Sequence, residues 1–105
     1  MIAKVNAKIE MTESMICNVE LWDVDLIVDD RIQTKEISVS GSVEFMFSLS
    51  ETGETKPELQ LRIFSADGKE LFRTKVDSTL NSNSIDKTTG FREVTTIDFG
   101  IIKIN

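Results

Sequence analysis

Histidine and tyrosine are absent from this chain of 105 residues, and cysteine, proline and tryptophan each occur once. Without histidine the chain lacks the most frequent general base of enzymes and the most frequent ligand of catalytic zinc. Cys17, the single cysteine, cannot form an internal disulfide, which fits a reducing compartment. No imidazole can take its proton, and it alternates with Val19 and Leu21, so we expect a buried structural thiol.

Basic clusters, glycine-rich phosphate loops and long apolar runs are also missing from the sequence. The net charge is -6 and the lysines are scattered, so we do not expect binding to nucleic acid or to an anionic membrane. No apolar run is long enough to span a bilayer, and the first residues alternate in polarity, unlike a signal peptide. We therefore predict a cytoplasmic protein without a cofactor.

Alternation of apolar and polar residues is what the sequence does contain, and it indicates half-buried β-strands. In the first such strand one face carries Ala3, Val5, Ala7, Ile9 and Met11. No segment of convincing length has the helical period. About six to eight strands with short connections predict an all-β fold, an antiparallel β-sandwich of immunoglobulin-like or jelly-roll-like type. Residues 1–105 are expected to form this single domain, with little or no helix.

The stretch ELWDVDLIVDD, residues 20–30, changes its alternation at Leu21-Trp22. Such a change predicts a β-bulge, because one extra residue turns every later side chain to the other face. The residues then expected to point inward are Trp22, Val24, Leu26 and Val28, and those expected to face solvent are Asp23, Asp25 and Asp29. The alternative role for Trp22 is a platform on which a ligand stacks.

Asp29 and Asp30 lie at the expected end of this strand, beside a loop. Carboxylates at such a place are the candidate ligands for a hard cation such as Ca²⁺, which needs six to eight oxygens from converging loops. A further ligand would have to come from Asp67, Asn83 or Asp86. The sequence thus offers Asp29 and Asp30 as a metal site and no candidate catalytic residue.

From Ile37 to Leu49 the odd positions are apolar and the even positions are mostly serine. We favour one continuous strand kinked at Gly41, and the alternative is a hairpin with a three-residue loop at residues 40–42. Met46 falls on the serine face, where an exposed methionine marks a partner contact. The candidate partner-binding residues are Met46, Ser38, Ser40 and Ser48.

The segments LQLRIF and ELFRTKV flank SADGK, which predicts a β-hairpin with a two-residue type I′ turn at Asp67-Gly68. This turn pairs Ile63 with Phe72, Arg62 with Arg73, and Leu59 with Val76, and the two arginines need a nearby acid. Residues 77–90 are polar and are expected to form a mobile loop. The chain then ends in FGIIKIN, which we interpret as an edge or swapped strand.

By elimination, the sequence indicates a small acidic protein that is not an enzyme and that binds another protein. A flat polar sheet face or an open strand edge suits docking, and homo-oligomers are also expected. The role would be that of an adaptor, inhibitor or assembly protein, encoded by a phage or mobile element. The alternative is a ligand-binding sandwich that holds carbohydrate or Ca²⁺ in its loops.

Overall fold

The computed structural model describes residues 2–49, 52, 56–80 and 94–104. This part of the chain contains seven β-strands and no helix that is long and apolar enough to cross a membrane. The strands are β1 (Ile2–Met11), β2 (Cys17–Asp23), β3 (Asp30–Ile37), β4 (Gly41–Ser48), β5 (Leu59–Ser65), β6 (Glu70–Arg73) and β7 (Val94–Ile104). Most of the loop predicted at residues 77–90 lies outside the described residues.

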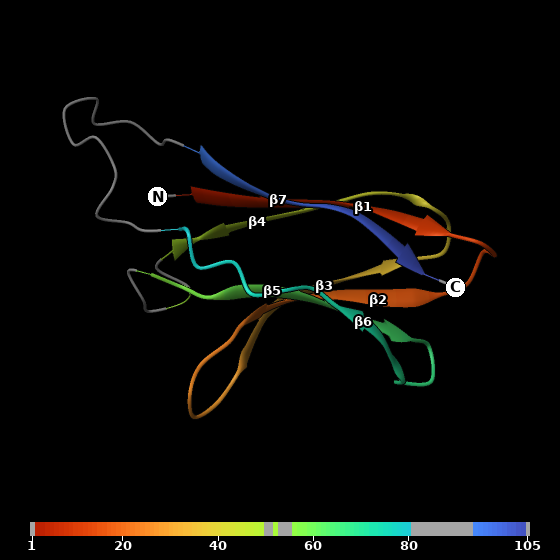
Figure 1. Cartoon of the computed structure of the whole chain (residues 1–105), viewed down its shortest axis with the longest axis horizontal. Coiled ribbons are helices and arrows are strands. Elements are labelled where there is room, and N and C mark those ends of the chain that lie inside the picture. Colours follow the sequence, from red (N-terminus) through yellow and green to blue (C-terminus); the bar gives the residue numbers. More distant parts are fainter. Residues whose placement is uncertain (1, 50–51, 53–55, 81–93, 105) are drawn as a thin grey trace.

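The strands form two sheets that face each other, so the predicted all-β sandwich is confirmed (Figure 1). One sheet has the order β4-β1-β7 and the other has the order β3-β2-β5-β6. The sandwich is not wholly antiparallel, because β1 pairs in parallel with β7. The first described strand therefore lies in the middle of its sheet, between β4 and β7.

Alternating side chains from both sheets fill one hydrophobic core, as their spacing predicts. The buried apolar residues of the strands are Ala3, Val5, Ala7 and Ile9 in β1, Cys17, Val19 and Leu21 in β2, Val43, Phe45 and Phe47 in β4, Leu59, Leu61 and Ile63 in β5, and Ile97, Ile102 and Ile104 in β7. Burial of each larger side chain stabilises the fold by about 1.5 to 3 kcal/mol.

Neither geometry proposed for residues 37–49 is correct. β3 ends at Ile37 and β4 begins at Gly41, and the two strands belong to different sheets. The chain crosses from one sheet to the other over residues 38–40. Ile37 and Val43 still face the same core, one from each sheet. Alternation of polarity therefore continues through the crossing, and it cannot distinguish a crossing from a continuous strand or a hairpin.

A register shift occurs at the predicted position, Leu21-Trp22, but the extra residue lies on the neighbouring strand, so the change of face predicted within this strand is wrong. Leu21 pairs with Gln33 and Trp22 with Arg31, so the additional residue is Ile32 of β3. β2 keeps one alternation throughout, and Asp23 is buried while Trp22 lies on the outer face of the sheet. The inward position expected for Trp22 and the exposed position expected for Asp23 are wrong.

The hairpin of β5 and β6 is confirmed, with Ile63 opposite Phe72 and Arg62 opposite Arg73. Its turn is longer than predicted. The N–H of Gly68 donates to the carbonyl of Ser65 (2.9 Å), and Gly68 alone has a positive φ of 89°, whereas a type I′ turn needs two such residues. The extra turn residue is followed by a register shift near Phe64, and Leu59 pairs with Asp77 instead of Val76.

The side of the sandwich formed by β3 and β4 is closed by two long side chains. Gln33 Nε2 donates to the Met46 carbonyl (2.6 Å), and Lys35 Nζ donates to the Glu44 carbonyl. The Lys35 ammonium also lies 5.4 Å from the centre of the Phe45 ring, a cation–π contact. Carbonyls on the edge of β4 thus find donors in the facing sheet, which makes this edge less available to another strand.

Candidate functional site

The connection between β2 and β3, residues 24–29, projects from the four-stranded sheet (Figure 1). Three consecutive apolar side chains at its end, which we call the apolar tip, are largely exposed: Leu26 at 102%, Ile27 at 92% and Val28 at 62%. The inward positions expected for Leu26 and Val28 are therefore wrong. β2 ends at Asp23, and the residues beyond it belong to a loop and contribute nothing to the core.

Backbone hydrogen bonds hold the base of this loop. The N–H of Val24 donates to the Glu58 carbonyl (2.7 Å), and the N–H of Glu58 donates to Asp23 Oδ1 (3.2 Å). Within the loop the N–H of Asp25 donates to Asp29 Oδ1 (3.0 Å). The buried Asp23 therefore has a structural role, because it joins the loop to the start of β5.

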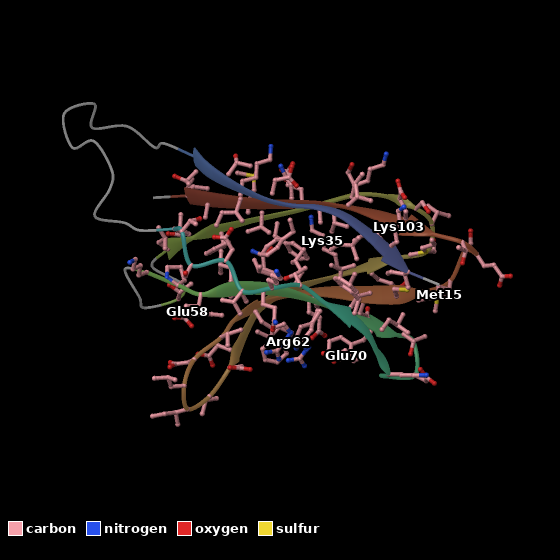
Figure 2. All side chains as sticks on the ribbon, viewed as in Figure 1. Met15, Lys35, Glu58, Arg62, Glu70 and Lys103 are labelled. Carbon is pink, nitrogen blue, oxygen red and sulfur yellow. The ribbon has the colours of Figure 1, made fainter. Side chains whose placement is uncertain are left out.

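Arg62 of β5 fixes the other end of the loop, on the outer side of the four-stranded sheet (Figure 2). Its Nη2 donates to Asp29 Oδ2 (2.6 Å) and its Nε donates to Gln60 Oε1 (2.8 Å). The guanidinium carbon lies 4.4 Å from the centre of the Trp22 ring. Arg62 is only 8% exposed, so this charge is satisfied by a hydrogen-bonded network and by an aromatic face.

The sequence indicated that the facing arginines Arg62 and Arg73 need an acid nearby, and Asp29 is that acid. The hydrogen bond from Arg62, followed by that from the backbone of Asp25, holds the pKa of the Asp29 carboxyl below its ordinary value. A depressed pKa in the folded state stabilises the fold at every pH above the unfolded-state pKa of about 3.9. This stabilisation is lost as the pH falls through the folded-state value.

We expect Asp29→Asn to lower the melting temperature at neutral pH and to have a progressively smaller effect as the solution is acidified. The reason is that acid protonates Asp29 in the natural chain and removes the same negative charge. Thermal unfolding followed by circular dichroism between pH 7 and about pH 2 measures this difference. Asp30→Asn is the matched control, because it removes a carboxylate next in the chain without touching Arg62. Equal effects of the two substitutions at every pH would contradict the role given to the ion pair.

The cation site predicted at Asp29 and Asp30 has little support from this geometry. Both oxygens of Asp29 accept hydrogen bonds from protein donors, and a guanidinium lies beside them. Among the described residues no group of three or more metal-ligating side chains comes together. Asp67 accepts a hydrogen bond from Ser65 in the β5–β6 turn, while Asn83 and Asp86 lie outside the described part of the chain. Cation binding stays a prediction without a matching ligand set.

The four candidate partner-binding residues do not share one strand. Met46 and Ser48 lie on β4, where Met46 is 48% exposed on the outer face of its sheet. Ser38 and Ser40 belong to the crossing between sheets, and Ser40 Oγ accepts a hydrogen bond from the N–H of Met11 (2.8 Å). The serine face expected over residues 37–49 is therefore divided, and a contact of Met46 with a partner stays a prediction.

The two remaining candidate residues, Cys17 and Trp22, contribute to the structure of the fold. Cys17 is fully buried, as expected, and burial raises the pKa of its thiol. Trp22 is half-buried, its Nε1 donates to Glu20 Oε1 (2.9 Å), and the Arg62 guanidinium lies over its ring. Because the guanidinium already stacks on this indole, the geometry does not favour Trp22 as a platform for a sugar.

The apolar tip was missed by sequence reasoning, although a signal was present. Leu26, Ile27 and Val28 are consecutive, so they cannot all follow the alternation of a strand. Aspartates on both sides of an apolar triplet indicate a loop as readily as they indicate a strand with a wet face. Placing the triplet required the end of β2, which only the structure shows.

Comparison with known proteins gives a likeness of fold and no family. No family model matches the chain, and no curated protein matches it. It is similar to part of the chain in the crystal structure of a 9R-lipoxygenase from Cyanothece PCC8801, with a TM-score of 0.57 and 16% sequence identity. The match covers 98% of this chain and 16% of that chain. At this identity the likeness concerns the sandwich fold alone.

Proposed function

We propose that this protein is a non-enzymatic binding module that docks onto another protein by inserting its apolar tip into a pocket. The observation that carries the proposal is the exposure of three consecutive apolar residues, Leu26, Ile27 and Val28, on a loop with a fixed base. A contiguous exposed apolar group that adds nothing to the core is a usual mark of an interaction site. In this proposal the protein is a cytoplasmic adaptor, inhibitor or assembly factor, as a phage or mobile element would encode.

The energetics of docking suit this arrangement. Removing each of the three side chains from water contributes about 1.5 to 3 kcal/mol before the costs of association. Those costs are reduced when a loop is already held in one conformation, as the hydrogen bonds of Asp29 and Val24 hold this one. A small tip of this kind can act as the buried centre of a larger and more polar interface.

The charge around the tip specifies the chemistry of the partner. Asp25 precedes the apolar triplet, Asp29 and Asp30 follow it, and the whole chain carries a net charge of -6. A complementary site is therefore an apolar pocket whose rim carries lysine or arginine side chains. Opposite charges at the rim would raise the rate of association and would make it sensitive to salt.

Replacing the three residues of the tip together, Leu26→Ser, Ile27→Ser and Val28→Ser, should abolish docking without unfolding the protein. The partner is first captured from the native cells with the natural chain and then purified. Its affinity for the triple variant, measured by calorimetry, should fall at least about 100-fold, since three buried apolar side chains are lost. A melting temperature close to that of the natural chain is expected, because the tip packs against nothing in the core.

The matched control is the pair Ile16→Ser and Val39→Ser, which removes exposed apolar side chains outside the tip. This control should bind the partner as the natural chain does. If the triple variant retains the affinity of the natural chain, docking through the tip is refuted. If the natural chain binds lipid vesicles and captures no protein, the tip has a membrane as its target and the proposal also fails.

A further inference from the structure

Among the described residues, no side chain closes the side of the sandwich formed by β6 and β7, in contrast to the side that Gln33 and Lys35 close. A groove of about 330 Å³ runs along it, lined in part by Phe72, Val76, Phe99, Ile101 and Ile102. Three of these side chains are unusually exposed for apolar residues: Phe72 at 39%, Val76 at 42% and Ile101 at 60%. We propose that a second copy of this chain covers this side by antiparallel pairing of the two β7 strands.

The free edge of β7 makes such pairing available. β7 runs from Val94 to Ile104, and among the described residues its only neighbour in the sheet is β1. A long edge strand presents backbone donors and acceptors that another strand can use. Pairing of two β7 strands about a two-fold axis would join two three-stranded sheets into one continuous sheet.

The two faces of β7 restrict which register is allowed. Asp98, Ile101 and Lys103 are exposed on the outer face, whereas Ile97, Ile102 and Ile104 are buried. The alternation shifts between Asp98 and Ile101, where the pairing with β1 is irregular and Gly100 has a φ of 76°. Residues directly opposite in an antiparallel pair must lie on the same face of the sheet.

One symmetric register satisfies this condition and also pairs opposite charges. With the two-fold axis between Gly100 and Ile101, Asp98 of each copy lies opposite Lys103 of the other, both on the outer face. Phe99 then lies opposite Ile102, with both side chains directed inward. Opposite charges in directly facing positions stabilise a strand pair, and symmetry provides this contact twice.

Gly100 fits the same register. Gly100 would lie opposite Ile101 of the second copy. The exposed Ile101 side chain would then cover a residue that has no side chain of its own. A Cβ built at Gly100 would meet nothing within 4 Å, which leaves room for that side chain. Phe72 and Val76 lie at the neighbouring edge of the other sheet and would approach the two-fold axis from both copies. The grooves of the two copies would then face each other and be covered.

Sedimentation velocity of the natural chain from micromolar to millimolar concentration tests the proposal, with charge variants to test the register. We expect a reversible dimer that Lys103→Glu and Asp98→Lys each weaken at least about tenfold, because each places like charges opposite one another. The double variant Asp98→Lys/Lys103→Glu restores the opposite charges and should recover the natural affinity to within about threefold. Circular dichroism melting of each variant confirms that it is folded, since Asp98 Oδ1 also accepts the N–H of Gly100 (2.8 Å).

Lys56→Glu is the matched control, because it makes the same change of charge at an exposed residue that is not part of β7. It should leave the dimer unchanged. A natural chain that stays monomeric at all concentrations would overturn the proposal and would give the bulge at Gly100 the protective role that bulges have on other edge strands. The proposal would also be overturned if neither charge reversal weakens the dimer, or if replacing the three residues of the apolar tip dissociates it.

Discussion

Replacing Phe45 with alanine is expected to lower the free energy of unfolding by about 3 to 5 kcal/mol. Phe45 is 1% exposed and is among the largest fully buried side chains of the described residues. Alanine would leave a cavity between the two sheets, and the Lys35 ammonium would lose the ring that it lies over. Since a domain of this size is stable by only about 5 to 15 kcal/mol, the substitution removes a large share of the total.

Chemical unfolding in urea, followed by circular dichroism, measures this loss. Met46→Ala is the matched control, because the neighbouring side chain lies on the outer face of the same strand and is 48% exposed. We expect Met46→Ala to change the stability by no more than about 0.5 kcal/mol. Similar losses for the two variants would show that Phe45 is not packed between the sheets.

Replacing Arg62 with alanine is expected to have the second largest effect, about 2 to 4 kcal/mol. The substitution removes the charged hydrogen bonds to Asp29 and Gln60 and the contact with the Trp22 ring. It also removes the apolar stem of a side chain that is almost fully buried. Because Arg62 holds Asp29, the loop of residues 24–29 should lose its fixed conformation at the same time.

Arg73→Ala is the control for Arg62→Ala, since Arg73 lies directly opposite on β6 but its side chain is 51% exposed and pairs with Glu70. We expect a change of less than about 1 kcal/mol for an exposed ion pair of this kind. Hydrogen exchange of residues 24–29 reports whether the loop keeps its conformation. The fluorescence of Trp22, the single tryptophan, reports whether its ring is still stacked. Unchanged exchange in Arg62→Ala would mean that the hydrogen bonds of Val24 and Asp23 hold the loop by themselves.

The sequence predicted those parts of the fold in which one face of a strand is buried and the strand continues. β1 is such a case, because Ala3, Val5, Ala7 and Ile9 alternate and are all buried. The alternation says nothing about which sheet a strand joins. The crossing at residues 38–40 was missed for that reason, and the parallel pairing of β1 with β7 depends on contacts that no local pattern records.

Asp23 shows why the candidate site was only partly predicted. From the sequence its carboxylate was expected to face solvent. In the structure Asp23 is 3% exposed, and its carboxylate accepts a hydrogen bond from the N–H of Glu58. A buried polar residue breaks the hydrophobic pattern, and the hydrogen-bond partner that permits it comes from a distant part of the chain. Asp29 was singled out from the sequence as a candidate cation ligand, and in the structure its carboxylate pairs with Arg62, a contact that no local pattern predicts.

The parallel pairing of β1 with β7 has a consequence for how the protein folds. The edge of β1 that faces β7 gains this partner only after β7 has left the ribosome, whereas all strands of the four-stranded sheet precede β7 in the chain. Contacts between strands so distant in sequence raise the contact order and slow folding toward the millisecond-to-second range of all-β domains. During synthesis all strands of the four-stranded sheet are therefore available before the three-stranded sheet can be completed by β7.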